Sequence, residues 1–338
     1  MAVPAIERKK KGQYYLLFSM LFFRWHYTRP EISRQMIANV SNLSRNGTKT
    51  VFVGSAGNGV KLPRFRGGVR VPFQHLAILA IVQGITEFLP ISSSGHLVLV
   101  PAVLGVPDQG LMLDVAVHVG TLGAVLLYLW RDVGAMAMGL GRLMRGRSDP
   151  GARLLGFLII GTIPVVAAGF ALNHFYPQGI RSLLVIGWTT LGFGLLLMIA
   201  DQVGMTLRRI EHLRYGDVIL VGVAQVLALI PGTSRSGICM TAGRVLGMER
   251  TDAARFAMLL GIPAITGAGV LKGYELWQSG NMALTGDVIV AASMSFVAAL
   301  FSVALMMAWL KRASFTPFAL YRLLLGGFLL AIGYGWVG

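Results

Sequence analysis

The sequence predicts an all-α, polytopic membrane protein built as an inverted-topology repeat, in which a re-entrant helix hairpin precedes three transmembrane helices in each half. Three observations predict this fold. Of the 338 residues, 55% are hydrophobic and only 13% are charged, whereas a soluble domain has about 25% charged residues. Apolar segments follow one another from residue 73 to the C-terminus. Two of these segments are broken by Pro, Gly and Ser, and the two breaks resemble each other.

Residues 1–70 differ from the rest and are predicted to be a basic extension that is disordered or arises from a mis-assigned start. They hold 13 Lys and Arg against 2 Asp and Glu, whereas residues 71–338 hold 17 against 12. The apolar run 14–23 is too short to cross a bilayer core of about 30 Å. Much of the net charge of +16 therefore lies outside the apolar body, and we expect no nucleic-acid partner. The membrane domain is expected at residues 71–338.

Six segments are long enough to span a membrane as helices of about 20 residues. They are Leu111–Trp130, Leu154–Leu172, Leu183–Ala200, Ala253–Lys272, Val288–Leu310 and Pro317–Val337. Two further apolar segments, Phe73–Pro107 and Asp217–Gly247, are interrupted at Pro90–His96 and at Pro231–Gly237. Polar irregular backbone at membrane depth is tolerated only when it is buried in protein or lines a wet cavity. We therefore expect two re-entrant hairpins.

The charge of the connecting loops predicts the orientation of the spans. Loops 131–153, 201–216 and 311–316 carry groups of Arg and Lys, whereas the loops 173–182 and 273–287 contain a single Lys or Arg between them, Arg181. Basic loops favour the cytoplasmic side. On this basis the first hairpin opens from outside and the second opens from the cytoplasm.

The two broken segments match at a constant offset of 142 residues, which predicts repeats at 73–200 and 217–338. The matching pairs are Gln83 with Gln225, Ser92 with Ser234, Ser94 with Ser236, Gly95 with Gly237, and Leu104-Gly105 with Leu246-Gly247. Apolar residues match easily by chance, so the paired Ser-x-Ser-Gly carries the argument. Because three spans follow each hairpin, the second copy has the opposite orientation, and both breaks are expected to meet near the midplane.

The first break brings together groups that suit acid–base or metal chemistry. Gln83 and Glu87 are spaced i,i+4 and share one helical face. A carboxylate in a membrane segment is costly unless it is paired, protonated or wetted. Glu87 is therefore expected to be a general base or a ligand of a divalent cation; the alternatives are a helix cap and an ion pair with an arginine.

The serines that follow suit a phosphate group. Ser92, Ser93 and Ser94 offer hydroxyls and, with Gly95, backbone N–H groups at the start of a helix, where anions are favoured. Capping of that helix is the alternative role. His96 comes within one turn of the serines and could take a proton from a serine or from water; a histidine satisfied within the core is the alternative.

The second break contributes an arginine, Arg235, between Ser234 and Ser236. Its planar guanidinium matches phosphate oxygens, and a salt bridge to Glu87 is the alternative.

Asp114 and His118, also spaced i,i+4, either complete the polar site or form a hydrogen-bonded pair between helices. The whole set suits hydrolysis of a phosphate ester or anhydride whose tail lies in lipid. No Walker A motif supports nucleotide-driven chemistry.

At these residues the sequence resembles the undecaprenyl-diphosphate phosphatase family, the bacitracin-resistance type of bacterial membrane enzyme. The resemblance lies in Gln83–His96, QGITEFLPISSSGH, and in Pro231–Gly237, PGTSRSG, and extends from about residue 73 to the C-terminus. It implies removal of the terminal phosphate from C55 isoprenyl diphosphate, which recycles the carrier lipid of peptidoglycan synthesis. It further implies an inner-membrane location with the active site towards the periplasm. Gln83 stands where many members carry Glu.

Carried over by position, the resemblance implies a catalytic set of Glu87, Ser93, His96 and Arg235. The residues implied to bind substrate are Gln83, Ser92, Ser94, Gly95, Thr233, Ser234, Ser236 and Gly237. A divalent cation, Mg²⁺ or Ca²⁺, is expected on Glu87, and no organic cofactor is expected. The expected partners are the polyprenyl diphosphate lipid and the bilayer, and a homodimer is compatible with the sequence.

A transporter or flippase for polyprenyl phosphate is the alternative function. Inverted repeats with broken helices are the usual scaffold of secondary transporters, and an intramembrane Glu with a His could relay protons. Flux of a labelled lipid phosphate through a hydrolysis-dead variant would distinguish the two.

Overall fold

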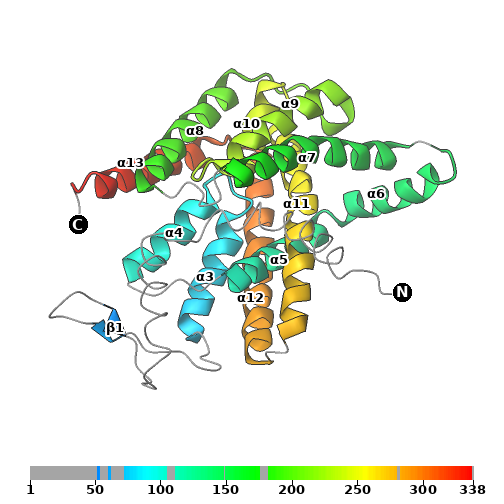
Figure 1. The fold of residues 1–338 in the computed structure, drawn as a ribbon. Helices are drawn as coiled ribbons and strands as arrows, with labels where there is room; N and C mark the ends of the chain where they lie inside the picture. Colours follow the sequence, from blue (N-terminus) through cyan, green and yellow to red (C-terminus); the bar gives the residue numbers. More distant parts are fainter. Residues whose placement is uncertain are drawn as a thin grey trace, which may run out of the picture.

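The computed structural model describes residues 52–53, 60–61, 72–104, 111–147, 149–175, 182–279 and 282–336. Apart from turns and loops, these residues are helical except for one antiparallel pair of two-residue strands, β1 (Phe52–Val53) and β2 (Val60–Lys61). The helices gather into one bundle (Figure 1), so the predicted helical class is confirmed. The predicted extension, residues 1–70, lies outside the described residues except for these two strands.

The first predicted hairpin consists of α3 (Phe73–Thr86) and α4 (Ser93–Leu104). A proline clashes with the carbonyl of the residue four positions earlier and offers no N–H. The proline of this break is Pro90, and α3 ends at Thr86, four residues before it. The irregular segment is therefore 87–92, which begins and ends slightly earlier than the predicted break.

The second hairpin consists of α9 (Tyr215–Val226) and α10 (Arg235–Val245). A short 3₁₀ turn, η3 (Leu227–Leu229), extends α9 towards Pro231. The proline again lies just beyond the point where regular α-helical bonding stops. Both hairpins thus break beside the predicted proline, and each irregular segment begins and ends a few residues before the predicted one.

Among the described residues, six of the seven other α-helices cover the predicted spans, and the seventh falls largely in the predicted loop 131–153. The seven are α5 (Leu111–Tyr128), α6 (Trp130–Leu143), α7 (Pro150–Phe175), α8 (Leu183–Val203), α11 (Arg250–Ser279), α12 (Met282–Leu310) and α13 (Thr316–Gly333), with a 3₁₀ turn, η2, at Ile210–His212. α5 and α6 meet at a bend of 83° at Leu129. The predicted loop 131–153 therefore contains most of a helix.

Several of these helices are long and apolar enough to cross a membrane. Within the described residues there are four, at Pro150–Leu172, Leu183–Val203, Thr285–Leu310 and Thr316–Gly333, and a fifth if α5 and α6 together make one bent span. The predicted spans Leu111–Trp130 and Ala253–Lys272 fall on α5 and α11. The chain is therefore a multi-pass membrane protein.

The surface of these helices is apolar, as expected for contact with lipid. Large side chains such as Trp188 on α8, Phe301 on α12 and Leu324 on α13 are 55%, 66% and 76% exposed. Lipid tails solvate such residues, so their exposure carries no hydrophobic cost in a bilayer. The interior contains an aromatic and aliphatic cluster that includes Phe88 and Phe256.

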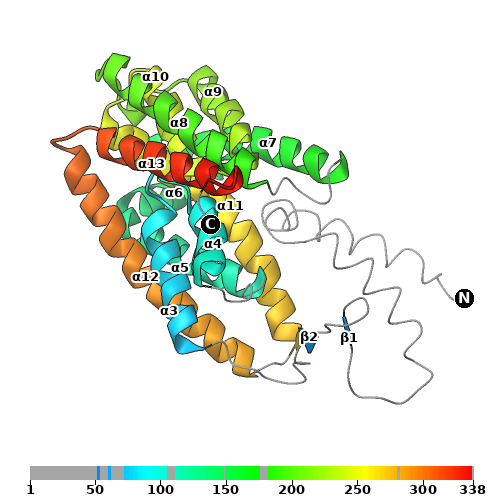
Figure 2. The ribbon, with the colours of Figure 1, turned by 90° about the vertical axis from the view of Figure 1, so that its left-hand side faces the viewer.

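Helices from the two halves of the chain pack on each other. α3 packs mainly on α12, α9 packs mainly on α7, and α8 lies along α13 (Figure 2). Glycines allow the close approach: a Cβ on Gly84 of α3 would lie 2.6 Å from the Cβ of Ala298 on α12, and a Cβ on Gly222 of α9 would lie 2.6 Å from the carbonyl oxygen of Gly161 on α7. The first helix of each hairpin thus rests on a long helix of the other half.

A buried ionic cluster joins the basic loops. Asp201 Oδ1 accepts hydrogen bonds from Arg244 Nε at 3.0 Å and from Arg250 Nε at 2.8 Å. Its other oxygen accepts from the Phe315 N–H at 2.9 Å. Asp201 and Arg244 are fully buried. This carboxylate therefore ties the end of α8 to the second hairpin and to the start of α13.

Replacing Asp201 with alanine should destabilise the protein by about 3 to 5 kcal/mol, because it leaves the buried Arg244 without its counter-charge. The thermal unfolding temperature in detergent measures this effect. Glu249→Ala is the matched control, since its ion pair with Arg209 is exposed and screened by water. An Asp201→Ala protein that unfolds at the wild-type temperature would contradict this role of the cluster.

Candidate active site

The two helix breaks contact each other in the interior of the bundle. Ser94 Oγ, in the first hairpin, accepts a hydrogen bond from the Gly232 N–H at 3.3 Å. Ser236 Oγ, in the second hairpin, donates to the Leu89 carbonyl at 3.1 Å. Two segments about 140 residues apart in sequence are therefore held together by their own polar groups.

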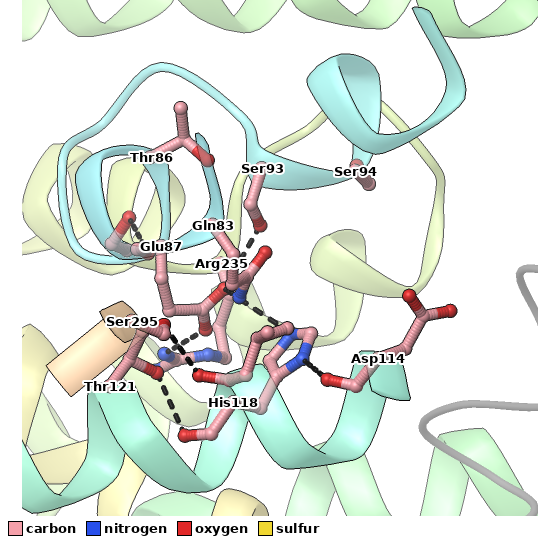
Figure 3. Close-up of polar contacts among 12 residues, drawn as sticks. Gln83, Thr86, Glu87, Ser93, Ser94, Asp114, His118, Thr121, Arg235 and Ser295 are labelled. Carbon is pink, nitrogen blue, oxygen red and sulfur yellow. Dashed lines mark hydrogen bonds and ion pairs between the residues drawn. The ribbon is translucent and has the colours of Figure 1, made fainter. Parts of the chain in front are cut away.

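Glu87 lies at the centre of this contact (Figure 3). Its Oε2 accepts hydrogen bonds from Gln83 Nε2 at 2.8 Å and from Ser93 Oγ at 2.9 Å. Its Oε1 accepts from Arg235 Nη2 at 3.2 Å. The side chains of Glu87 and Arg235 are only 6% and 7% exposed. The structure thus joins three members of the expected catalytic set, Glu87, Ser93 and Arg235, in one hydrogen-bonded group.

The guanidinium of Arg235 is held from several sides. Nη1 donates to the Ala257 carbonyl at 3.4 Å, and Cζ lies 5.9 Å from the centre of the Phe88 ring. Among the described residues, its buried Nε finds no acceptor. A guanidinium with a donor left over can still bind an oxygen of an anion.

His118 on α5 also faces Glu87. Its Nε2 lies 3.5 Å from Glu87 Oε2, and its Nδ1 lies 2.6 Å from the carbonyl oxygen of Asp114. The sequence singled out Asp114 and His118 as a pair. In the structure the His118 ring bonds to the backbone carbonyl of Asp114 and points to Glu87, whereas the Asp114 carboxylate lies on the other side of that ring (Figure 3). Spacing alone could not tell which of the two faces the site.

The contacts of His96 differ from the expected ones. Its Nδ1 lies 2.8 Å from the carbonyl oxygen of Ser92, and its Nε2 lies 2.6 Å from the hydroxyl of Tyr321 on α13. The two rings are stacked, with centroids 5.6 Å apart. The physical reason is local: one turn of helix places the ring against the Ser92 carbonyl, which directs the other nitrogen towards α13.

Both breaks contain a serine with strained backbone. Ser92 has φ = 74° and Ser234 has φ = 68°, a left-handed conformation that costs a non-glycine residue about 1 to 2 kcal/mol. In each break the strained serine contacts the serine two positions later, with Oγ–Oγ distances of 3.1 Å and 3.2 Å. Ser93 and Arg235 are the residues that directly follow the strained serines.

The other residues expected to bind substrate lie around this contact. Gly95 and Gly237 lie in the first turns of α4 and α10. Gly237 N–H donates to Ser234 Oγ at 3.2 Å, so Ser234 caps α10, the alternative role for a serine in a break. Thr233 is fully buried, and within the described part of the chain its hydroxyl has no partner.

The residues that the structure describes do not by themselves form a complete metal site. Within the described residues, no group of three or more His, Cys, Asp or Glu side chains could hold a metal ion. Both oxygens of Glu87 already accept hydrogen bonds from the protein. Mg²⁺ is nonetheless often bound by one or two carboxylates together with substrate phosphates.

Comparison with known proteins identifies similar chains. The family model described as bacitracin resistance protein BacA matches residues 76–328. A protein of Rhodospirillum rubrum named undecaprenyl-diphosphatase 1 is 53% identical over 266 residues, which cover 77% of this chain and 94% of that protein. An undecaprenyl-diphosphatase of Ruegeria pomeroyi is 51% identical over 263 residues, with 77% of this chain and 98% of that protein covered. One from a Jannaschia species is 53% identical over 262 residues, with the same coverage.

Proposed function

The chain belongs to the bacitracin resistance protein BacA family, and from this membership we propose that it is an undecaprenyl-diphosphate phosphatase. The enzyme hydrolyses undecaprenyl diphosphate to undecaprenyl phosphate and inorganic phosphate. This activity recycles the carrier lipid for peptidoglycan synthesis and accounts for bacitracin resistance. The names of the relatives do not favour the alternative, a transporter. The observation that carries the proposal is the contact of Glu87 with both Ser93 and Arg235 at the junction of the two breaks.

Arg235 is the proposed ligand of the diphosphate. Its planar fork can donate to two phosphate oxygens at once. In the structure one nitrogen donates to Glu87 and the buried Nε has no acceptor among the described residues. The diphosphate therefore competes with Glu87 for this guanidinium, and binding it frees the carboxylate to act as a base.

Ser93 and Glu87 are the proposed pair for proton transfer. The hydroxyl of Ser93 donates to Glu87 Oε2, so its proton passes to that oxygen when Ser93 Oγ attacks the terminal phosphorus. The bond from this phosphorus to the bridging oxygen breaks, and the bridging oxygen leaves as part of undecaprenyl phosphate. Water then releases inorganic phosphate from Ser93, and the hydroxyl is restored. In the other mechanism that fits this contact, Ser93 orients a water molecule whose proton Glu87 takes.

His96 belongs to the same proposed set, and its contacts suit an indirect role. It contacts the Ser92 carbonyl, directly before Ser93 in the chain. We propose that the remaining hydroxyls and N–H groups of the breaks orient the headgroup, with Gln83 holding Glu87 in place through its amide.

We propose that Glu87, together with oxygens of the diphosphate, would hold a divalent cation, Mg²⁺ or Ca²⁺. When bound it would neutralise charge on the phosphate oxygens. The protein alone supplies too few ligands for a resident site among its described residues. A chelator should therefore lower phosphate release without changing the unfolding temperature; a lower unfolding temperature would point instead to a structural metal.

The fold proposed for this function is the inverted repeat of two hairpins and six spans. Its support is the pair of matched breaks, each with a serine at positive φ, and the packing of α3 on α12 and of α9 on α7. With the basic loops in the cytoplasm, the first hairpin opens to the outside. We accordingly propose a bacterial inner-membrane protein whose site faces the periplasm.

Purified protein in detergent should release phosphate from a C15 or C55 isoprenyl diphosphate, and the absence of release would contradict the proposed function. Ser93→Ala separates the two mechanisms. Activity at background level favours a covalent role for Ser93, whereas clear residual turnover favours water that Ser93 helps to orient.

Gly261→Ala should lower kcat about 10- to 100-fold through Arg235, with little loss of stability. A Cβ at Gly261 of α11 would lie 2.7 Å from Arg235 Nη1 and 2.8 Å from Nη2. The guanidinium is the flexible end of its side chain, so it moves away from Glu87 while the backbone stays.

Gly273→Ala is the matched control on the same helix, because a Cβ at Gly273 meets nothing within 4 Å. Equal activity of the two variants would contradict the need for this position of Arg235.

A further inference from the structure

The C-terminal helix α13 carries two neighbouring side chains that contact the two breaks and that the proposed mechanism does not use. Tyr321 contacts His96 of the first hairpin, and Arg322 contacts the backbone of the second break. Successive residues on a helix point about 100° apart, so one helix can reach both breaks. α13 itself is fixed by its long packing against α8.

Tyr321 supports the backbone of the first break through His96. A carbonyl oxygen only accepts hydrogen bonds, so His96 Nδ1 carries the hydrogen in its 2.8 Å contact with the Ser92 carbonyl. In the neutral ring, Nε2 then accepts from the Tyr321 hydroxyl at 2.6 Å. The chain of bonds runs from Tyr321 through His96 to Ser92, the residue with φ = 74°.

Arg322 supports the backbone of the second break directly. Its Nη2 donates to the carbonyls of Gly232 at 3.0 Å and Thr233 at 2.8 Å, and its Nε donates to the Thr190 carbonyl at 3.2 Å. The residue is fully buried, and no ion pair between it and a carboxylate occurs in the described part of the chain. Its Nη2 and Nε therefore donate to backbone carbonyls at membrane depth, while its buried Nη1 has no partner among the described residues.

We propose that Tyr321 and Arg322 are positioning residues for the reaction, one for each break. Each supports the backbone at or directly before a serine held at positive φ, and the residue after that serine is a proposed catalytic group. Ser93 follows Ser92, and Arg235 follows Ser234. A change of backbone conformation at either serine redirects the next side chain, so α13 sets the geometry of the Ser93–Glu87–Arg235 group without touching the substrate.

The inference rests on the proposed function and is tested with steady-state phosphate release by the full chain in detergent. Tyr321→Phe removes only the hydroxyl and should lower kcat about 10-fold, with KM within twofold and an unchanged unfolding temperature. Tyr334→Phe is the matched control at the end of α13, since that hydroxyl accepts from Trp188 Nε1 of α8 at 3.4 Å rather than from a residue of either break. This control should keep wild-type kcat.

A double variant distinguishes action through His96 from an independent effect. In a His96→Gln background, Tyr321→Phe should change kcat less than twofold. The His96→Gln exchange has already removed the imidazole that links the Tyr321 hydroxyl to the Ser92 carbonyl. A further 10-fold loss there would contradict the chain of bonds. Full activity of Tyr321→Phe alone, or a loss seen only in KM or in unfolding temperature, would overturn the role of Tyr321.

Arg322→Lys tests the second break without removing the charge. A single ammonium cannot donate to all three carbonyls in the geometry of the guanidinium, so kcat should again fall about 10-fold while the protein still folds. Wild-type kcat in the Arg322→Lys protein would overturn the role of Arg322. If the wild-type chain released no phosphate at all, the proposed function would fail instead, so the two failures are distinct.

Discussion

Glu87→Gln should reduce kcat by a factor of about 10³ or more, because the variant keeps the shape of the side chain and loses both the base and the negative charge. The Ser93 hydroxyl would then have no carboxylate to receive its proton. Arg235 would lose its ion-pair partner, and a guanidinium buried to this extent is costly without one.

Phosphate release and the unfolding temperature, measured on the same preparation, separate catalysis from folding. Glu211→Gln is a suitable control, because this carboxylate is 60% exposed and lies outside the breaks. Turnover of Glu87→Gln within tenfold of wild type, with an intact fold, would exclude Glu87 as the base.

Arg235→Lys should reduce kcat/KM by about 10²- to 10³-fold even though it conserves the charge. Other enzymes lose a similar factor in rate when one preorganised hydrogen-bond donor to a developing anion is removed. Lysine offers a point charge in place of a planar fork. It therefore cannot hold two phosphate oxygens as the guanidinium can, whose Cζ lies 5.9 Å from the centre of the Phe88 ring.

Arg250→Lys is the control for this exchange, since Arg250 bonds to Asp201 at the loop end of the bundle. A wild-type kcat/KM for Arg235→Lys would show that bidentate binding of the diphosphate is not needed.

Much of the fold follows from a few residues that can be recognised in the sequence. Pro90 and Pro231 predict where the helices break, and both breaks occur beside them. The paired Ser-x-Ser-Gly predicts that the breaks meet, and the hydrogen bond from Gly232 to Ser94 joins them. Because the two breaks meet, Glu87 of the first and Arg235 of the second lie close enough to form an ion pair. These features are local or repeated, so a single sequence contains them.

Other features depend on tertiary packing that no local pattern encodes. The bend at Leu129 between α5 and α6 lies at the end of the predicted span, and the loop predicted to follow it contains most of α6. The partner of His96 Nε2 is Tyr321, a residue 225 positions away. Arg322 carried a usable signal, since an arginine inside an apolar span is costly and requires partners; its partners, however, are backbone carbonyls that only the folded chain brings together.

The most direct test of the central claim, that both breaks act on one diphosphate, is a double-mutant cycle on phosphate release with Glu87→Gln, Arg235→Lys and the combined variant. If the two side chains serve one reacting group, their effects are not additive, and the double variant is little worse than the poorer single variant. Independent roles predict that the two losses multiply. Multiplied losses, or a single variant with wild-type turnover, would contradict the account.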